Sequence, residues 1–340
     1  AITRQLETLD YVQPFQQGFG GSFELATKIA KHTPGNLNQI FYTICGSTAV
    51  ETALKICIAY HKARGHGQRF RFVGRERAYH GMNIGATSVG GMINNVKTFA
   101  NILMPGVVHM RHTHLPEHKF VKGQPETGAD LANDLERIAL NFGAENIAAC
   151  IVEPISGSTG TLVPPKGYLN RLREICDKHD ILLIFDEVIT LRINHGGAQN
   201  YFGVTPDLTC MGKIIGGGLP VGGIGGKEEF MQLFNPESSN PVMHASTFSG
   251  NALTMSAGLP AMRMYNEDEC NRINLLAERL RDGFNQAFAD AGILGNAAGV
   301  GSLTNINFTE GILNDSRDYL DGLFKAKHIG QLLHLSMLRH

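Results

Sequence analysis

The sequence predicts an α/β fold in which helices flank a mainly parallel sheet. Short runs of apolar and β-branched residues alternate with longer segments of helical periodicity, as in strands that are joined by crossover helices. Several of the short runs are apolar almost throughout, which is typical of strands that helices cover on both faces. At 340 residues, the chain is long enough to bury a sizeable core and to carry a smaller second domain.

The individual elements follow from this alternation. Strands are predicted at residues 39–44, 71–74, 147–154, 181–188, 207–212 and 221–226, and helices at 47–63 and 167–180. The strand ILLIFDEV (181–188) is the most informative, because its apolar run ends in Asp186 and Glu187. Both charges therefore emerge at the carboxyl end of a buried strand, which is where open α/β sheets bind ligands.

The character of the sequence changes near residue 251. Helices are predicted at 251–265, at 268–290 and near 318–337, with a glycine-marked strand at 299–308. We expect a large α/β domain over 1–250, in which 1–20 form an N-terminal arm, and a smaller α+β domain over 251–340. The final residues lack a cap, a proline or a polar tail, so we expect the small domain to be truncated. We also expect the N-terminal arm to be incomplete.

Composition excludes several classes of function. The 30 Lys and Arg residues balance 31 Asp and Glu residues, which leaves no electrostatic footprint for nucleic acid or for an anionic membrane. No segment resembles a membrane helix or a secretory leader. Six scattered cysteines without a Cys-x-x-Cys pair argue against a disulfide framework or a zinc site. We expect a soluble cytoplasmic protein with small-molecule partners.

A histidine cluster raises the question of a metal site. His109, His112, His114 and His118 lie close together in the sequence, and imidazole is a common ligand of transition metals. No acidic or cysteine ligand accompanies them, so we expect a polar loop and no metal.

The segment ICGSTAVETALK (44–55) indicates a phosphate-binding turn. A strand leads through Gly46, Ser47 and Thr48 into a helix, whose free N–H groups and dipole would face an anion. The alternative is that the two hydroxyl residues only cap the helix.

Three further residues suggest a site for a planar cofactor. Tyr79 follows a strand end and could stack on a ring, although a core tyrosine beside a turn glycine fits as well. Asp186 could pair with a protonated ring nitrogen. Lys213 ends one apolar run and precedes Gly216–Gly218, so we expect a desolvated, nucleophilic amine. The alternative is a surface lysine beside a glycine loop.

These signatures stand in one order along nearly the whole chain. They are the Gly-Ser-Thr turn, Tyr79-His80-Gly81, Glu153-Pro154, Asp186-Glu187-Val188, Lys213, and Ser246-Thr247-Phe248-Ser249-Gly250-Asn251. The order resembles that of the class-III aminotransferases, which depend on pyridoxal 5′-phosphate (PLP) and adopt the fold-type-I architecture.

The resemblance implies a role for each residue. Lys213 would form the internal aldimine, Asp186 would pair with the ring nitrogen, and Tyr79 and Val188 would pack against the two faces of the ring. The other implied cofactor contacts are Gly46, Ser47 and Thr48 at the phosphate, Glu153 near the hydroxyl side, and Thr247 at the phosphate of the neighbouring subunit. A homodimer with shared active sites is therefore implied.

The resemblance also implies a class of reaction. Residues 1 to about 190 are similar to β-alanine or ω-amino-acid:pyruvate aminotransferases, whereas residues from about 195 are similar to glutamate-1-semialdehyde aminomutases and β-phenylalanine aminotransferases. We expect amino transfer from a β- or ω-amino acid or amine to a keto acid such as pyruvate or 2-oxoglutarate. The alternatives are an aminomutase, which transfers the group within one molecule, and a non-catalytic scaffold.

Three departures from the family pattern bear on the substrate. Cys45 replaces the usual serine and Thr48 the usual glutamate, and the usual Gly-Phe after the Asp-Glu-Val motif is missing. Arg192 stands near that gap, and its guanidinium could accept a substrate carboxylate. The alternative is an exposed loop arginine.

Overall fold

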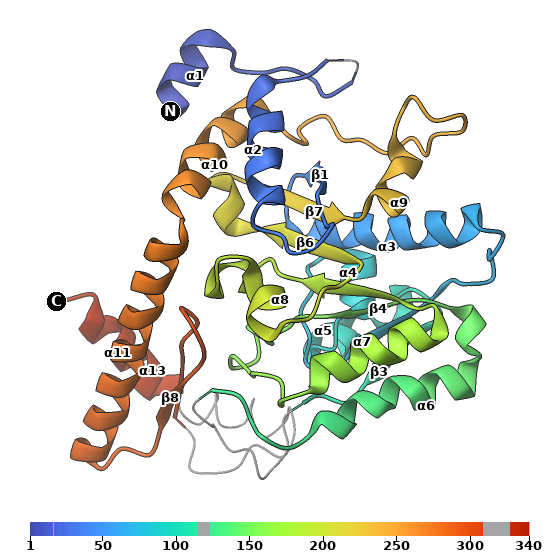
Figure 1. Ribbon diagram of the computed structural model, residues 1–340. Helices are drawn as coiled ribbons and strands as arrows, with labels where there is room; N and C mark the ends of the chain where they lie inside the picture. Colours follow the sequence, from blue (N-terminus) through green and yellow to red (C-terminus); the bar gives the residue numbers. More distant parts are fainter. Residues whose placement is uncertain (16, 114–122, 309–326, 340) are drawn as a thin grey trace.

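The computed structural model describes residues 1–15, 17–113, 123–308 and 327–339 and contains a seven-stranded sheet (Figure 1). The strand order is β1-β7-β6-β5-β4-β2-β3, and only β7 runs antiparallel to its neighbours. The strands are β1 (Gln39–Thr43), β2 (Arg71–Arg75), β3 (Val107–Met110), β4 (Ile147–Val152), β5 (Leu182–Asp186), β6 (Leu208–Gly212) and β7 (Gly222–Gly226). The predicted α/β class with a mainly parallel sheet is confirmed.

The helices predicted at 47–63, 167–180, 251–265 and 268–290 correspond to α3, α7, α10 and α11, and the structure adds further helices without a predicted range. The α-helices up to the site are α1 (Ile2–Thr8), α2 (Gly20–Ala30), α3 (Gly46–Ala63), α4 (Ile84–Val89), α5 (Ile93–Phe99), α6 (Asn133–Phe142), α7 (Tyr168–His179), α8 (Gly197–Phe202) and α9 (Glu228–Met231). Further on lie α10 (Ala252–Met264), α11 (Glu267–Ala291) and α13 (Lys327–Met337). In the described part of the chain, no helix is long and apolar enough to span a membrane.

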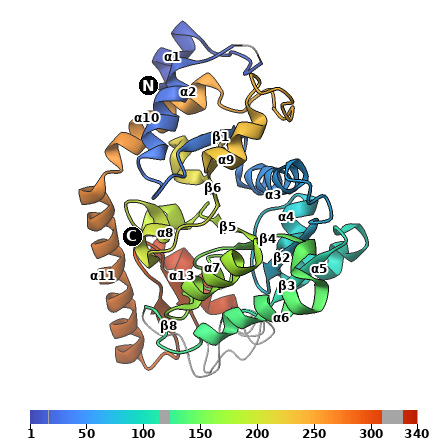
Figure 2. The ribbon, with the colours of Figure 1, turned by 45° about the vertical axis from the view of Figure 1, so that its right-hand side comes forward.

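Helices cover both faces of the sheet, and the alternation of side chains in β5 shows how. Leu183 and Phe185 join a core cluster with α6 and α7, whereas Leu182 and Ile184 face a second cluster built around α3. Figure 2 shows these helices on opposite sides of the sheet. Because side chains alternate along a strand, Asp186 lies on the α3 side. The alternation of side chains along β5 therefore directs this carboxylate toward the start of α3.

The C-terminal part differs in one element from the prediction. The predicted strand 299–308 is reduced to β9 (Asn305–Asn307), which pairs with β8 (Asn296–Ala298). The preceding residues form a turn instead, because Gly299 and Gly301 take positive φ angles of 145° and 53°. Much of the helix predicted near 318–337 lies outside the described residues. The domain boundary at residue 250 stays a prediction.

Helix α10 packs against the turn that carries Lys213. This turn is the 3₁₀ helix η6 (Lys213–Gly216). A Cβ atom at Gly258 of α10 would lie 2.2 Å from the carbonyl oxygen of Ile215, and one at Gly217 would lie 2.2 Å from that of Ala257. The absence of side chains at both positions allows the two backbones to touch. Helix α10 thereby fixes the position of η6.

Replacing Gly258 by alanine should therefore destabilise the protein by about 1–3 kcal/mol, because the new methyl group overlaps backbone that cannot move away freely. Gly283→Ala in α11 is a matched control, since nothing lies within 4 Å of a Cβ atom there. This change should stabilise the protein by about 0.5–1 kcal/mol. Urea unfolding of the two variants measures both effects. Equal effects would show that the contact between α10 and η6 is loose.

Candidate active site

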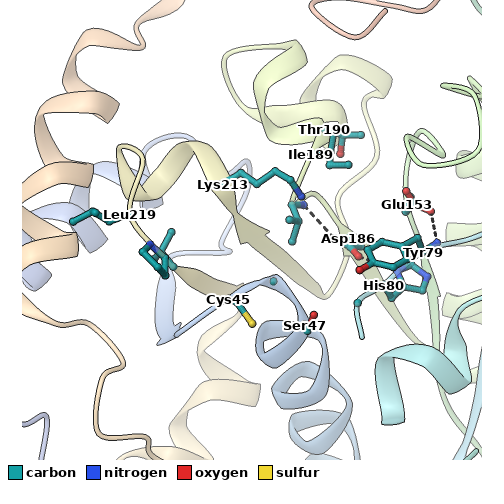
Figure 3. A pocket seen from close by; sticks show the side chains of 15 residues that line it. Cys45, Ser47, Tyr79, His80, Glu153, Asp186, Ile189, Thr190, Lys213 and Leu219 are labelled. Atoms are coloured by element: carbon teal, nitrogen blue, oxygen red, sulfur yellow. Dashed lines mark hydrogen bonds and ion pairs between the residues drawn. The ribbon is translucent and has the colours of Figure 1, made fainter. Parts of the chain in front are cut away.

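A cavity of about 310 Å³ lies at the carboxyl ends of the central strands (Figure 3). It combines residues from the start of α3, from the segment after β2, and from the ends of β4, β5 and β6. Its lining is Cys45, Gly46, Ser47, Tyr79, His80, Gly81, Glu153, Asp186, Val188, Ile189, Thr190, Lys213, Leu219, Pro220 and Val221. Most of the predicted site residues therefore meet in one pocket.

Asp186 is the last residue of β5, and two donors hold its carboxylate. The backbone N–H of Val188 donates to Oδ1 at 3.1 Å, and Nδ1 of His80 lies 2.9 Å from Oδ2. The side chain of His80 is fully buried and that of Asp186 is 6% exposed. Both carboxylate oxygens are thus engaged before any ligand binds, which fixes the orientation of the group.

Glu153 supports the pocket by holding the backbone next to Tyr79. Its Oε1 accepts a hydrogen bond of 2.9 Å from the backbone N–H of Tyr79, and its Oε2 accepts one of 3.1 Å from the N–H of Gly157. Burial is the main reason why the pKa of Glu153 is raised. Tyr79 is 38% exposed in this chain and lines the cavity, so its side chain is accessible to a ligand.

The start of α3 forms the opposite wall. A Cβ atom at Gly46 would lie 3.0 Å from the methyl groups of Val188, and one at Gly81 would lie 2.4 Å from Oγ of Ser47. The glycines therefore let α3 and the Tyr-His-Gly segment approach closely. Ser47 Oγ accepts a hydrogen bond of 3.1 Å from the backbone N–H of Met82 and retains its own proton for a ligand.

Thr48 serves the helix rather than the pocket. Its hydroxyl donates to the carbonyl oxygen of Cys45 at 2.8 Å and accepts from the N–H of Cys45 at 3.1 Å. Thr48 does not line the cavity. In this chain it therefore caps the helix, as the alternative interpretation of the sequence predicts. Cys45 does line the cavity. Burial alone would raise the pKa of its thiol, but hydrogen bonds with Thr48 and Ser47 outweigh burial and lower this pKa.

Lys213 follows β6 and takes a left-handed backbone conformation, with a φ angle of 46°. This conformation costs a residue with a side chain about 1–2 kcal/mol, and such strain is concentrated at functional sites. Figure 3 shows its side chain pointing toward the end of β5. The expectation of a desolvated amine is wrong for the isolated chain, because Lys213 is exposed. The cavity opens to solvent there, and these residues alone do not cover the amine.

Two predicted residues lie away from the pocket. Arg192 is exposed, and its Nε donates to Oγ of Ser302 at 3.1 Å, so the structure does not bring its guanidinium to the cavity. Thr247 is also exposed. Its neighbours Ser246 and Ser249 line a second cavity of about 270 Å³, so Thr247 does not contribute to the Lys213 pocket of its own chain.

The model of one protein family matches residues 1–328, and its description is "Aminotransferase class-III". The chain belongs to this family. An omega-aminotransferase of Caulobacter vibrioides is 48% identical over 275 residues, which cover 79% of this chain and 62% of that protein. A glutamate-1-semialdehyde 2,1-aminomutase of Bacillus licheniformis is 37% identical over 318 residues, which cover 92% of this chain and 69% of that protein. The chain thus spans about three fifths of the length of the omega-aminotransferase.

Solved transaminases share the fold of this class-III chain. The crystal structure of the omega transaminase from Pseudomonas jessenii in complex with PMP matches with a TM-score of 0.79 and 28% identity, covering 91% of this chain and 69% of that chain. The predicted fold-type-I architecture is therefore confirmed.

The pocket of this class-III chain suits a phosphorylated, planar, cationic ring. The N-terminus of α3 directs backbone N–H groups toward an anion, and the absence of a Cβ atom at Gly46 leaves room beside Val188. Asp186 supplies a buried negative charge and Lys213 a primary amine. This set of donors fits the cofactor that the family uses.

His80 and several wall residues belong to the site although the sequence does not predict them. The Tyr-His-Gly motif places His80 next to Tyr79, but its hydrogen bond to Asp186 joins two segments that are distant in the sequence. The described residues contain no cluster of three potential metal ligands, and His114 and His118 lie outside them.

Glu187, next to Asp186, is fully buried and stabilises the part of the pocket wall that contains Thr190. It accepts hydrogen bonds from the N–H groups of Ala198 and Gln199 at 2.9 and 2.7 Å and from the Thr190 hydroxyl at 2.7 Å. Burial outweighs these bonds and raises the pKa of the carboxyl from 4.5 to about 7. Over that interval, the folded chain retains a proton that the unfolded chain has released.

The contribution of Glu187 to stability should therefore decrease as the pH rises from 4.5 to about 7. Relative to Glu187→Gln, which cannot ionise, the wild type should lose about 1–3 kcal/mol of unfolding free energy across this interval. Urea unfolding of both proteins at pH 5 and pH 8 measures the difference. A difference that does not change with pH would contradict the raised pKa.

Proposed function

We propose that the protein is a PLP-dependent aminotransferase. It moves an amino group from a β- or ω-amino acid or amine to a keto acid such as pyruvate or 2-oxoglutarate. One observation carries the proposal: Lys213 and Asp186, at the ends of the neighbouring strands β6 and β5, line the same pocket as the start of α3. The family and the 48% identity to an omega-aminotransferase support it.

The predicted site residues that line the pocket each have a task in this proposal. Bound PLP supplies an electron sink for the carbanion at the substrate carbon. Asp186 would hold the positive charge of the ring nitrogen, and His80 and the Val188 N–H keep its carboxylate in place. Gly46 and Ser47 would bind the phosphate through the start of α3. Tyr79 would stack on the ring and Val188 would pack on its other face, while Glu153 holds the Tyr79 backbone.

Lys213 is the residue of this pocket that would carry the cofactor and move protons. Its primary amine would hold the cofactor covalently and would act as the general base at the substrate carbon. Its place at the end of a strand, in a turn held by α10, restricts the amine to one side of the pocket. Thr48 acts by capping α3. Arg192 could bind a substrate carboxylate only after a movement that brings its side chain to the cavity.

An aminomutase is the second candidate. A specific observation favours it: the aminomutase match extends over 318 residues, whereas the omega-aminotransferase match covers 275. The two functions use the same lysine and carboxylate. They differ in whether the amino group leaves with one molecule and arrives on another.

Spectroscopy of the holoprotein separates these candidates. β-Alanine should bleach the absorbance band of the lysine-bound cofactor, and pyruvate or 2-oxoglutarate should restore it. Lys213→Ala should lack both the band and turnover, whereas Lys166→Ala, which removes an exposed lysine outside the pocket, should behave like the wild type. Bleaching without recovery by any keto acid would contradict the aminotransferase and favour the aminomutase.

We further propose a cytoplasmic homodimer with shared active sites. The exposure of Lys213 and of Thr247 in one chain supports it, because a partner chain would cover the amine and receive the Thr247 hydroxyl at its phosphate. The six cysteines are all free thiols, in keeping with a reducing compartment.

Mixing two variants tests the sharing. Thr247→Ala alone should weaken PLP binding at both sites of its dimer. In a mixed dimer with Lys213→Ala, one site should combine an intact Lys213 with an intact Thr247 from the partner and should recover wild-type PLP affinity. Affinity purification of co-expressed chains with two different tags yields the mixed dimer. Sites that act within one chain would leave every Lys213-containing site weak.

A further inference from the structure

The pocket wall formed by Ile189 and Thr190 continues directly into a short 3₁₀ helix, η5 (Thr190–Ile193). Glu187 holds the beginning of this helix through the Thr190 hydroxyl and through its own carbonyl oxygen, which accepts from the N–H of Leu191 at 3.1 Å. Its end carries the carbonyl groups of Arg192 and Ile193. What holds these carbonyl groups decides how firmly the wall is placed.

Side chains from the C-terminal part bind both carbonyl groups. The hydroxyl of Tyr265, at the end of α10, donates to the carbonyl oxygen of Arg192. Oγ of Ser302 donates to the same oxygen at 3.3 Å. Nδ2 of Asn274, in α11, donates to the carbonyl oxygen of Ile193 at 2.8 Å. We call Tyr265, Asn274 and Ser302 the clasp.

The surroundings of the clasp are packed tightly. Tyr265 is only 8% exposed, and Leu191 and Ile193 are buried in two different core clusters. A Cβ atom at Gly301 would lie 2.9 Å from Cβ of Ile193, so the turn before β9 touches η5 directly. Little free volume remains through which η5 could shift while the clasp is intact.

Two residues of the clasp lie on or next to the helices α10 and α11, since Tyr265 follows α10 and Asn274 lies in α11. Helix α10 contacts η6 through Gly258, and the hydroxyl of Thr254 in α10 donates to the carbonyl oxygen of Pro220 at 3.3 Å. Figure 1 shows α10 and α11 following each other down one side of the molecule. These helices therefore reach both the wall that contains Thr190 and the wall that contains Lys213 and Pro220.

We propose that Tyr265 and Asn274 are positioning residues of the active site, which set the distance between these two walls by fixing η5. The inference deepens the proposed function and rests on it, because wall placement matters for a cofactor and substrate held between the walls. Neither residue lines the cavity. They act through the backbone of η5.

Paired asparagine substitutions in α11 test the proposal. Asn274→Leu removes the donor to η5. Asn285→Leu is the matched control, because Asn285 binds the backbone of Ala297 in β8 through hydrogen bonds of 3.0 and 2.7 Å and lies in the same helix. Hydrogen exchange of the Val188 and Leu191 amides and PLP dissociation constants are measured for the full chain, with Tyr265→Phe as a second test of the clasp.

Asn274→Leu and Tyr265→Phe should each accelerate exchange of these two amides about tenfold and weaken PLP binding about 3- to 10-fold, as the loss of one hydrogen bond predicts. Asn285→Leu should lower the unfolding midpoint without either effect. Equal exchange and equal PLP affinity in the Asn274 and Asn285 variants would overturn the proposal.

The proposed function and the role of the clasp can be disproved independently. A wild-type protein that binds no PLP would overturn the proposed function. Hydrogen exchange of the protein without cofactor would then test the clasp alone. Faster exchange of the Val188 and Leu191 amides in the clasp variants only would support the role of the clasp, and equal exchange in all variants would overturn it.

Discussion

The site depends on one constraint, which is that β4, β5 and β6 run parallel and end at the same edge of the sheet, beside the start of α3. Parallel order brings Glu153, Asp186 and Lys213 together although they lie far apart in the sequence. The alternation of side chains in β5 then places the Asp186 carboxylate on the α3 side of the sheet. The N-terminus of α3 favours a bound anion, whereas the carboxylate favours a bound cation. Acid, amine and anion-binding turn meet because of this geometry, before any side chain is oriented.

Orientation comes from contacts around the pocket. His80 and the Val188 N–H hold Asp186, and Glu153 holds the backbone of Tyr79. Helix α10 supports the lysine turn by direct backbone contact at Gly258. The polar groups of the pocket are therefore largely fixed before a ligand binds. Little binding energy is lost in ordering these side chains. What the single chain does not provide is a cover over Lys213, which is exposed.

The sequence predicted the fold and the central residues because their signals are local. An apolar run that ends in a charge marks Asp186, and a lysine before a glycine run marks Lys213. Thr48, Arg192 and His80 were harder, since their partners are decided by tertiary contacts. Thr48 caps its own helix, Arg192 turns toward Ser302, and His80 meets Asp186 across 106 residues of sequence. The strand predicted at 299–308 begins only at β9, because the positive φ angles of Gly299 and Gly301 depend on the tertiary fold and leave no mark in the sequence.

We propose that Lys213 carries the cofactor in this pocket. Reduction of the PLP-loaded protein with borohydride, followed by proteolysis and mass spectrometry of the labelled peptide, tests this assignment most directly. We expect a phosphopyridoxyl group on Lys213 at a stoichiometry of about one per chain, as a single covalent site requires. A label on another lysine, or scattered over several surface lysines, would contradict it.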